Sequence, residues 1–160
     1  MKLKHLSAVA AVATFVLIGA ALSTSSAQQA EDPINLEMRF SEAKFQMIDN
    51  PPHMTKKRPS ESPGDMVVAR GWLRDPAGDR AGRIHSTFTV TGGKSPKTTE
   101  LATGIIDLKG GQVAIQGVIG TESTDVLPIV GGSGDYEGAR GSVEITNGRR
   151  AVTFALNILP

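Results

Sequence analysis

The chain has 160 residues, a formal net charge of +1 and no cysteine. This length fits a single domain, the balanced charge offers no electrostatic footprint for nucleic acid, and the lack of cysteine excludes disulfides, Cys nucleophiles and Cys-ligated metal sites. Aromatic residues make up only 4% of the chain, which argues against a stacking platform for sugars or single-stranded nucleic acid.

The N-terminal segment predicts a secretory signal peptide over residues 1–27. Two lysines precede an apolar run from Ala8 to Ala21, and a stretch of small residues ends at Ala27. The run is shorter than the roughly 20 residues of a membrane span, which makes a membrane anchor the weaker alternative. We therefore expect cleavage after Ala27, a secreted mature protein without a stable membrane span, and a flexible lead-in over residues 28–35.

Residues 36–160 are expected to form one all-β domain. Apolar residues recur with a period of two, in short runs separated by Gly, Pro, Asn and Asp, and no segment shows a convincing helical period. Eight antiparallel strands can close into a barrel that holds side chains or one small ligand, with a sandwich as the alternative. The predicted strands are 36–48, 65–74, 83–91, 98–108, 112–120, 125–130, 139–146 and 150–159.

A cluster of glycines precedes the seventh predicted strand. It predicts a tight loop followed by a strand that bends or is approached closely by its neighbour. Arg140 lies within this cluster, and we expect it to form a structural ion pair with Asp65 or Asp135, because charges are rarely buried unpaired. The segment is not a nucleophile elbow, since the final glycine of that motif is replaced by Asp135 and a strand follows instead of a helix. The glycines are Gly131, Gly132, Gly134, Gly138 and Gly141.

Three motifs in this order carry a family resemblance: "PGD" at 63–65, "GGQVAIQG" at 110–117 and "GGSGDYEGARG" at 131–141. Together they resemble the allene oxide cyclase-like barrel family, which is related in fold to the dirigent proteins. The resemblance implies an eight-stranded antiparallel β-barrel with an apolar lumen, a secreted bacterial member, and a homo-oligomer that is a trimer or a dimer. Members of the family cyclise reactive fatty-acid epoxides, and related dirigent proteins steer radical coupling.

The chain departs from the plant cyclases in its first strand. Those enzymes carry a Glu and an Asn two residues apart, whereas Lys44 and Gln46 stand at the matching places here. The plant reaction is therefore not supported. Glu42 lies one alternation further back and would face the same side of the strand as Gln46. His85 is a further candidate acid or base, because an unperturbed histidine titrates near neutral pH.

We take Glu42, Gln46 and His85 as candidate catalytic groups, and Arg70, Trp72 and Gln116 as candidate ligand contacts. The two histidines beyond the signal peptide show no metal-ligand spacing, so no metal and no cofactor are expected. The sequence thus predicts a secreted barrel that binds or sterically guides a small apolar or amphipathic molecule. The alternatives are a cyclase or isomerase acting on a reactive lipid or secondary metabolite, and a structural surface protein with a packed barrel.

Overall fold

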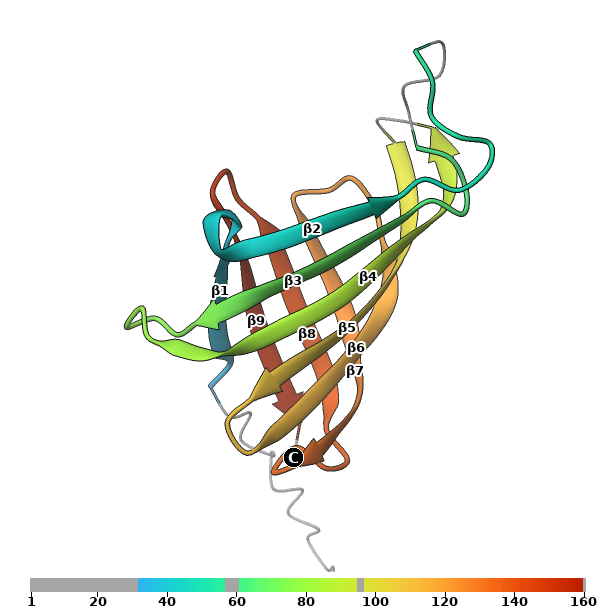
Figure 1. Ribbon diagram of the computed structural model, residues 1–160. Coiled ribbons are helices and arrows are strands. Elements are labelled where there is room, and N and C mark those ends of the chain that lie inside the picture. The colour runs from blue at the N-terminus through green and yellow to red at the C-terminus, as the bar shows by residue number, and fades with distance from the viewer. Residues whose placement is uncertain (1–31, 57–60, 95–96, 160) are drawn as a thin grey trace, which may run out of the picture.

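The computed structural model describes residues 32–56, 61–94 and 97–159, and the predicted signal peptide lies outside them. No helix within these ranges is long and apolar enough to cross a membrane. The described residues form a single nine-stranded sheet and one 3₁₀ turn (Figure 1). In chain order the elements are β1 Ile34–Arg39, η1 Phe40–Glu42, β2 Ala43–Ile48, β3 Met66–Arg74, β4 Arg80–Lys94, β5 Lys97–Leu108, β6 Gly111–Ile119, β7 Thr124–Gly134, β8 Arg140–Asn147 and β9 Ala151–Leu159.

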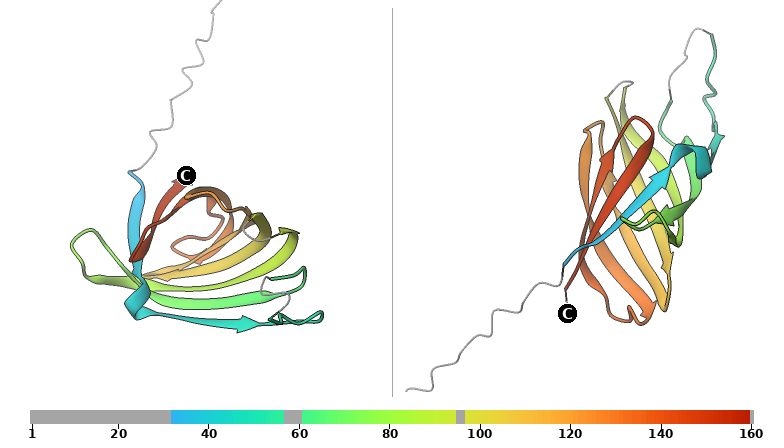
Figure 2. Two further views of the ribbon diagram at one scale, coloured as in Figure 1. Left: turned by 90° about the horizontal axis from the view of Figure 1, so that it is seen from above. Right: turned by 90° about the vertical axis from the view of Figure 1, so that its left-hand side faces the viewer.

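All strand pairs are antiparallel, in the order β1-β9-β8-β7-β6-β5-β4-β3-β2. A further pairing of β1 with β3, where Glu37 lies opposite Arg74, closes the sheet into a barrel (Figure 2). The sequence predicts one strand from Leu36 to Ile48, but η1 divides it, and its halves pair with β9 and β3. Because β1 and β2 are two parts of one barrel strand, the expected eight-stranded antiparallel barrel is confirmed.

The domain boundary also shifts slightly, because β1 begins at Ile34, inside the segment expected to be a flexible lead-in. The η1 turn has a second effect, on which residues face the interior. In β1 the even-numbered Leu36 and Met38 are buried, whereas in β2 the odd-numbered Phe45 lines the interior cavity. The turn thus changes the inward parity of this broken strand, which a single uninterrupted strand cannot do.

The core lies inside the barrel and is built from alternate residues of each strand. Leu73, Ile106, Val113 and Val143 have no solvent-exposed surface. Their sequence neighbours face outward and are polar or partly exposed, as in a sheet with one buried face. The chain has no cysteine, and a domain of this size can be stable on its core alone.

The glycine cluster bears out part of the prediction. Residues 135–138 form the expected tight turn, and the following strand is closely approached by its neighbour, since a Cβ atom at Gly141 would lie 2.0 Å from the Asn157 carbonyl oxygen.

The first three glycines of the cluster are placed differently. The sixth predicted strand ends at residue 130, but β7 continues to Gly134 and pairs there with β6. Ala114 pairs with Gly131 and Ile115 with Ile129, so Val130 is an extra residue in a β-bulge. A Cβ atom at Gly132 would lie 2.2 Å from the carbonyl oxygen of Tyr136. Glycine is therefore needed at position 132 because the turn that follows β7 folds back against the strand and leaves no room for a side chain. The strand does not end at this position.

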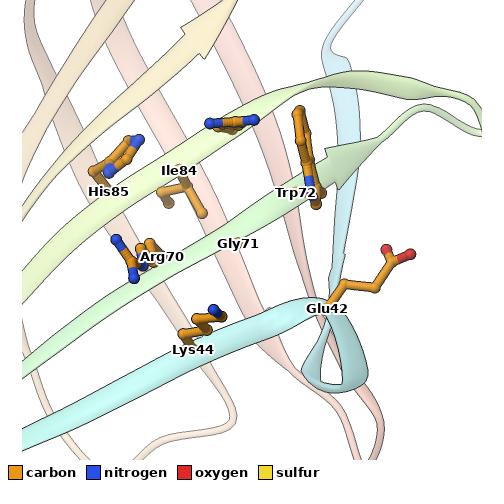
Figure 3. A pocket seen from close by; sticks show the side chains of 8 residues that line it. Glu42, Lys44, Arg70, Gly71, Trp72, Ile84 and His85 are labelled. Atoms are coloured by element: carbon orange, nitrogen blue, oxygen red, sulfur yellow. The ribbon is translucent and has the colours of Figure 1, made fainter.

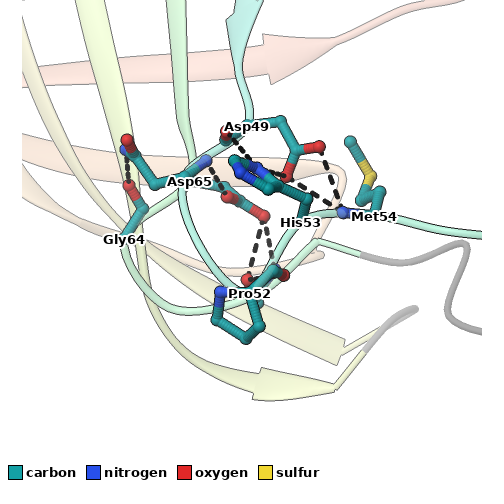
Figure 4. A network of polar contacts seen from close by, with 8 residues as sticks. Asp49, Pro52, His53, Met54, Gly64 and Asp65 are labelled. Atoms are coloured by element: carbon teal, nitrogen blue, oxygen red, sulfur yellow. Dashed lines mark hydrogen bonds and ion pairs between the residues drawn. The ribbon is translucent and has the colours of Figure 1, made fainter.

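The long loop between β2 and β3 is tied together at Asp65, whose side chain is almost fully buried. Its carboxylate accepts hydrogen bonds from the backbone N–H groups of Asn50 (2.8 Å) and Ser62 (2.6 Å), and from the Ser62 hydroxyl (3.2 Å) (Figure 4). The Asn50 side chain donates to the Gly64 carbonyl at 2.6 Å. Asp65 thus joins the two ends of this loop. Arg140 lies at the start of β8, and its pairing with Asp65 or Asp135 stays a prediction.

Candidate functional site

The barrel encloses a cavity of about 160 Å³. Residues from every strand line it, and most of them are apolar. Small residues leave the space open: Ala69 from β3, and Ala102 and Gly104 from β5, stand where larger side chains would fill the barrel. We call this space the lumen cavity. Its other lining residues are Met38, Phe40, Phe45, Ile84, Ser86, Phe88, Thr103, Ile115, Ile119, Asp125, Leu127, Ile145, Asn147, Val152 and Phe154.

Two aromatic side chains lie between the lumen cavity and solvent. Phe40 in η1 and Phe45 in β2 both line the cavity, and they are 39% and 54% exposed. Their rings meet edge to face, with centroids 6.2 Å apart. This geometry is a favourable one for aromatic pairs. The pair therefore marks an opening of the cavity and presents an apolar edge to an entering molecule.

The polar groups of the cavity are few. Ser86 from β4, Asp125 from β7 and Asn147 from β8 line it together with the apolar side chains. Asp125 accepts a hydrogen bond from the backbone N–H of Gly120 at 3.3 Å, which leaves further acceptor sites on its carboxylate. An apolar pocket with a few polar groups binds an apolar molecule and fixes its orientation through one or two hydrogen bonds. A hydroxyl or amine is the group that Asp125 would select.

Glu100 introduces a second carboxyl near this site. It lies on β5, on the same parity as the buried Ala102 and Ile106, and opposite Val90 and Ile119 of the neighbouring strands. Burial raises the pKa of Glu100, and the negative charges of Glu61 and Asp125 raise it further. A carboxyl with a raised pKa is better placed than an ordinary one to exchange a proton near neutral pH.

The residues predicted from sequence to contact a ligand do not line the lumen cavity. Glu42, Arg70, Trp72 and His85 instead line a separate cleft over β2, β3 and β4, together with Lys44, Gly71, Arg83 and Ile84 (Figure 3). Gln46 and Gln116 are exposed and lie opposite Val68 and Thr103. The structure thus brings four of the six candidates together, on the outer face of the barrel. Their roles in catalysis and ligand binding stay predictions.

Glu42 is already engaged on this outer face. Both of its carboxylate oxygens accept hydrogen bonds from the Arg74 guanidinium, at 2.8 Å from Nε and 2.5 Å from Nη2. The hydrogen bonds from Arg74 lower the pKa of Glu42. Glu42 is therefore a carboxylate held by an ion pair, not a proton donor near neutral pH. Among residues 32–56, 61–94 and 97–159, no three His, Asp or Glu side chains are grouped so as to hold a metal ion.

Comparison of the sequence with protein families and with curated proteins finds no match. Solved structures do match the fold. A pyocyanin demethylase superposes with a TM-score of 0.63 at 16% identity, over 79% of this chain and 98% of the demethylase. A pterocarpan synthase dirigent protein gives 0.60 at 15% identity, over 82% and 97%. The chain has the allene oxide cyclase/dirigent-type barrel fold. An exo-specific intermolecular Diels–Alderase also matches, with a TM-score of 0.60 at 13% identity over 79% and 93%.

In this dirigent-type barrel, sequence reasoning missed Glu100, Asp125 and Asn147. Each shares the parity of buried residues on its strand: Glu100 with Ala102, Asp125 with Leu127, and Asn147 with Val143. The sequence signal for such residues is a polar side chain near a strand end, at a position that continues the alternation of the apolar residues. This signal can be used only when the inward-facing side of the strand is known, and the sequence alone does not show which side faces the lumen.

Proposed function

We propose that the barrel binds or sterically guides a small apolar or amphipathic molecule in its lumen cavity. The observation that carries this proposal is an apolar cavity of about 160 Å³, opened to solvent beside Phe40 and Phe45, with Asp125 among its few polar groups. Holding a flexible molecule in one conformation removes part of the barrier to its reaction without a strong acid or base. Guidance therefore needs only shape and a few hydrogen bonds.

The size of the cavity limits the ligand. A cavity of about 150 Å³ in another protein binds benzene, so this lumen accepts one ring or a short chain. A larger ligand extends past Phe40 and Phe45 into solvent. The similar structures support a small-molecule role, since their names are those of a demethylase for pyocyanin, a pterocarpan synthase and a Diels–Alderase.

The second candidate function is a cyclase or isomerase that acts on a reactive lipid or secondary metabolite. Glu100 favours this function. Its pKa is raised, its side chain is on the same side of β5 as the buried residues, and the negative charge of Asp125 acts on it. Asp125 lines the cavity and Glu100 does not, so Asp125 would contact the substrate and Glu100 would act beside it in moving a proton. The open cavity disfavours the remaining alternative, a structural protein whose barrel is filled by its own side chains.

We also propose that the mature protein acts after export and as a homo-oligomer. The first part rests on the signal-peptide pattern of residues 1–27. The second is supported by exposed apolar side chains on the outer faces of β5, β6 and β7, where Leu101, Val118 and Val126 are 38%, 64% and 63% exposed. Light scattering on the mature chain tests it. A dimer or trimer that Val118→Lys converts to monomer is expected, and a monomeric wild type would refute it.

Binding of 2-naphthol tests the lumen proposal, because one of its two fused rings fits the cavity, the other can extend past Phe40 and Phe45, and its hydroxyl can bond to a polar group of the lining. We expect saturable binding by ligand-observed NMR, weakened by Ala102→Leu, which fills the cavity. Gln112→Leu is the matched control, since Gln112 is exposed on β6. Equal binding by both variants, or no binding by the wild type, would contradict the proposal.

Native mass spectrometry of the protein purified from its own secreted fraction identifies the natural ligand. A small apolar molecule released on denaturation is expected. A bare protein mass, together with no uptake of 2-naphthol, would favour a barrel without a ligand.

A further inference from the structure

The outer face of the barrel carries a second hollow, which we call the outer cleft. It has a volume of about 230 Å³ and lies over β2, β3 and β4, on the opposite side of these strands from the lumen cavity. Lys44, Arg70, Arg83 and His85 line it together with Trp72 (Figure 3). This density of basic side chains contrasts with the near-neutral chain as a whole.

Three of the basic side chains form one row across the strands. Lys44 lies directly opposite Arg70, and Arg70 directly opposite His85. Directly opposite residues on neighbouring strands have Cβ atoms about 5 Å apart, and like charges in such pairs destabilise a sheet. In the part of the chain that the structure describes, none of these three side chains makes an ion pair or a hydrogen bond. Lys44 and Arg70 therefore repel each other, and a bound anion would relieve this repulsion.

Two arginines stack on Trp72 beside this row. The guanidinium carbon of Arg83 lies 3.7 Å from the centre of the Trp72 ring, and that of Arg80 lies 4.3 Å from it. Stacking on an aromatic ring fixes a guanidinium and leaves its in-plane N–H groups free to donate. Both arginines are thus ordered before any ligand arrives.

The acidic residues near the outer cleft do not neutralise it. Glu42 lines one end, but both of its carboxylate oxygens are bound by Arg74. Asp107 lies opposite Arg83 in the β4–β5 register, yet it makes no ion pair with it, and the Arg83 guanidinium rests on Trp72 instead. The cationic groups of the cleft therefore keep unused hydrogen-bond donors.

We propose that the outer cleft binds a phosphate or sulfate group carried by a small soluble molecule. A tetrahedral oxyanion can accept hydrogen bonds from several directions at once, which suits basic side chains that line one cleft from three neighbouring strands. A planar carboxylate has only two oxygens and would leave some of these hydrogen-bond donors without a partner. The concave shape and the small volume favour a compact anion over an extended polymer or a flat membrane surface. This site is independent of the lumen cavity and of what that cavity binds.

Trp72 reports on this site directly, because it is the only tryptophan of the chain. We expect sodium phosphate or sodium sulfate to change Trp72 fluorescence with saturation, where sodium chloride at equal ionic strength does not. In Arg70→Gln, phosphate binding is expected to weaken about tenfold or more, since a charge-assisted hydrogen bond is lost. Lys109→Gln, with the same change of charge in the exposed β5–β6 turn, should bind as the wild type does.

Thermal unfolding gives a second test, because the proposal predicts the direction of the Tm change both with and without phosphate. Phosphate should raise the Tm of the wild type and of Lys109→Gln. In phosphate-free, low-salt buffer, Arg70→Gln should melt above the wild type, because it removes the repulsion between Arg70 and Lys44. Equal effects of phosphate and chloride in all three proteins would overturn the proposal. So would binding to phosphatidylglycerol vesicles, with none to phosphatidylcholine vesicles, in a protein that ignores free phosphate and sulfate.

Discussion

The rings of Phe40 and Phe45 meet edge to face, 6.2 Å apart, at an opening of the lumen cavity. Replacing Phe45 with Ala removes one side of this opening, so 2-naphthol should bind and leave faster. The free energy of unfolding should fall by only about 1 kcal/mol, because Phe45 is half exposed, whereas a buried Phe costs about 3–5 kcal/mol. Stopped-flow fluorescence measures the two rate constants. Val68→Ala, at an exposed apolar position of β3, is the control, and unchanged rates in Phe45→Ala would show that ligands enter elsewhere.

The strand pattern was predictable because burial on one face imposes a period of two. Ile84, Phe88 and Val90 follow this period, and the glycine-containing turns mark where strands meet. The sequence could not show which of the two alternating sets of residues faces the interior of the barrel. Either parity gives the same alternation, and only closure of the barrel buries Ile84 and leaves His85 exposed.

Two local features could not be predicted from the sequence, and the reasons are physical. Phe40–Glu42 reads as a continuation of the strand, and it turns only because β1 and β2 pair with different partners, β9 and β3. The glycines after Val130 favour a loop by local propensity, but pairing with β6 keeps them in a strand. Both outcomes depend on contacts with segments far along the chain.

Asp65 should contribute more to stability than an exposed aspartate, because its buried carboxylate accepts hydrogen bonds from two backbone N–H groups. Asp65→Ala leaves the Asn50 and Ser62 backbone donors without their acceptor in a buried site, which costs about 1–3 kcal/mol for each such group left unsatisfied. Urea unfolding should therefore show a loss of at least about 2 kcal/mol. The exposed Asp79 gives the control, with Asp79→Ala expected to change stability by about 0.5 kcal/mol or less. Similar losses in both variants would mean that the loop ends are held by other contacts.

The ion pair of Glu42 with Arg74 should stabilise the protein in a pH-dependent way. The pKa of Glu42 is lower in the folded chain than in the unfolded chain, so its contribution is present above the unfolded pKa and is lost as the pH falls through the folded value. Tm measured from pH 7 down to pH 3 should therefore fall more steeply in the wild type than in Glu42→Gln. Parallel curves would show that the two side chains do not interact in solution.

Glu100 should show the opposite dependence, because its pKa is raised by burial and by the charges of Glu61 and Asp125. A raised folded pKa means that stability is highest below the unfolded pKa, and that it falls as the pH rises toward the folded value. Glu100→Gln stays neutral, so it should melt above the wild type at pH 7 and lose this decline. Under either function proposed for the lumen, Glu100→Gln should keep its affinity for 2-naphthol. Loss of turnover in this variant, with binding retained, is expected only of a cyclase or isomerase that relies on this carboxyl. A Tm equal to that of the wild type at both pH 5 and pH 7 would show that Glu100 is solvated in the folded protein and would remove it as a proton carrier.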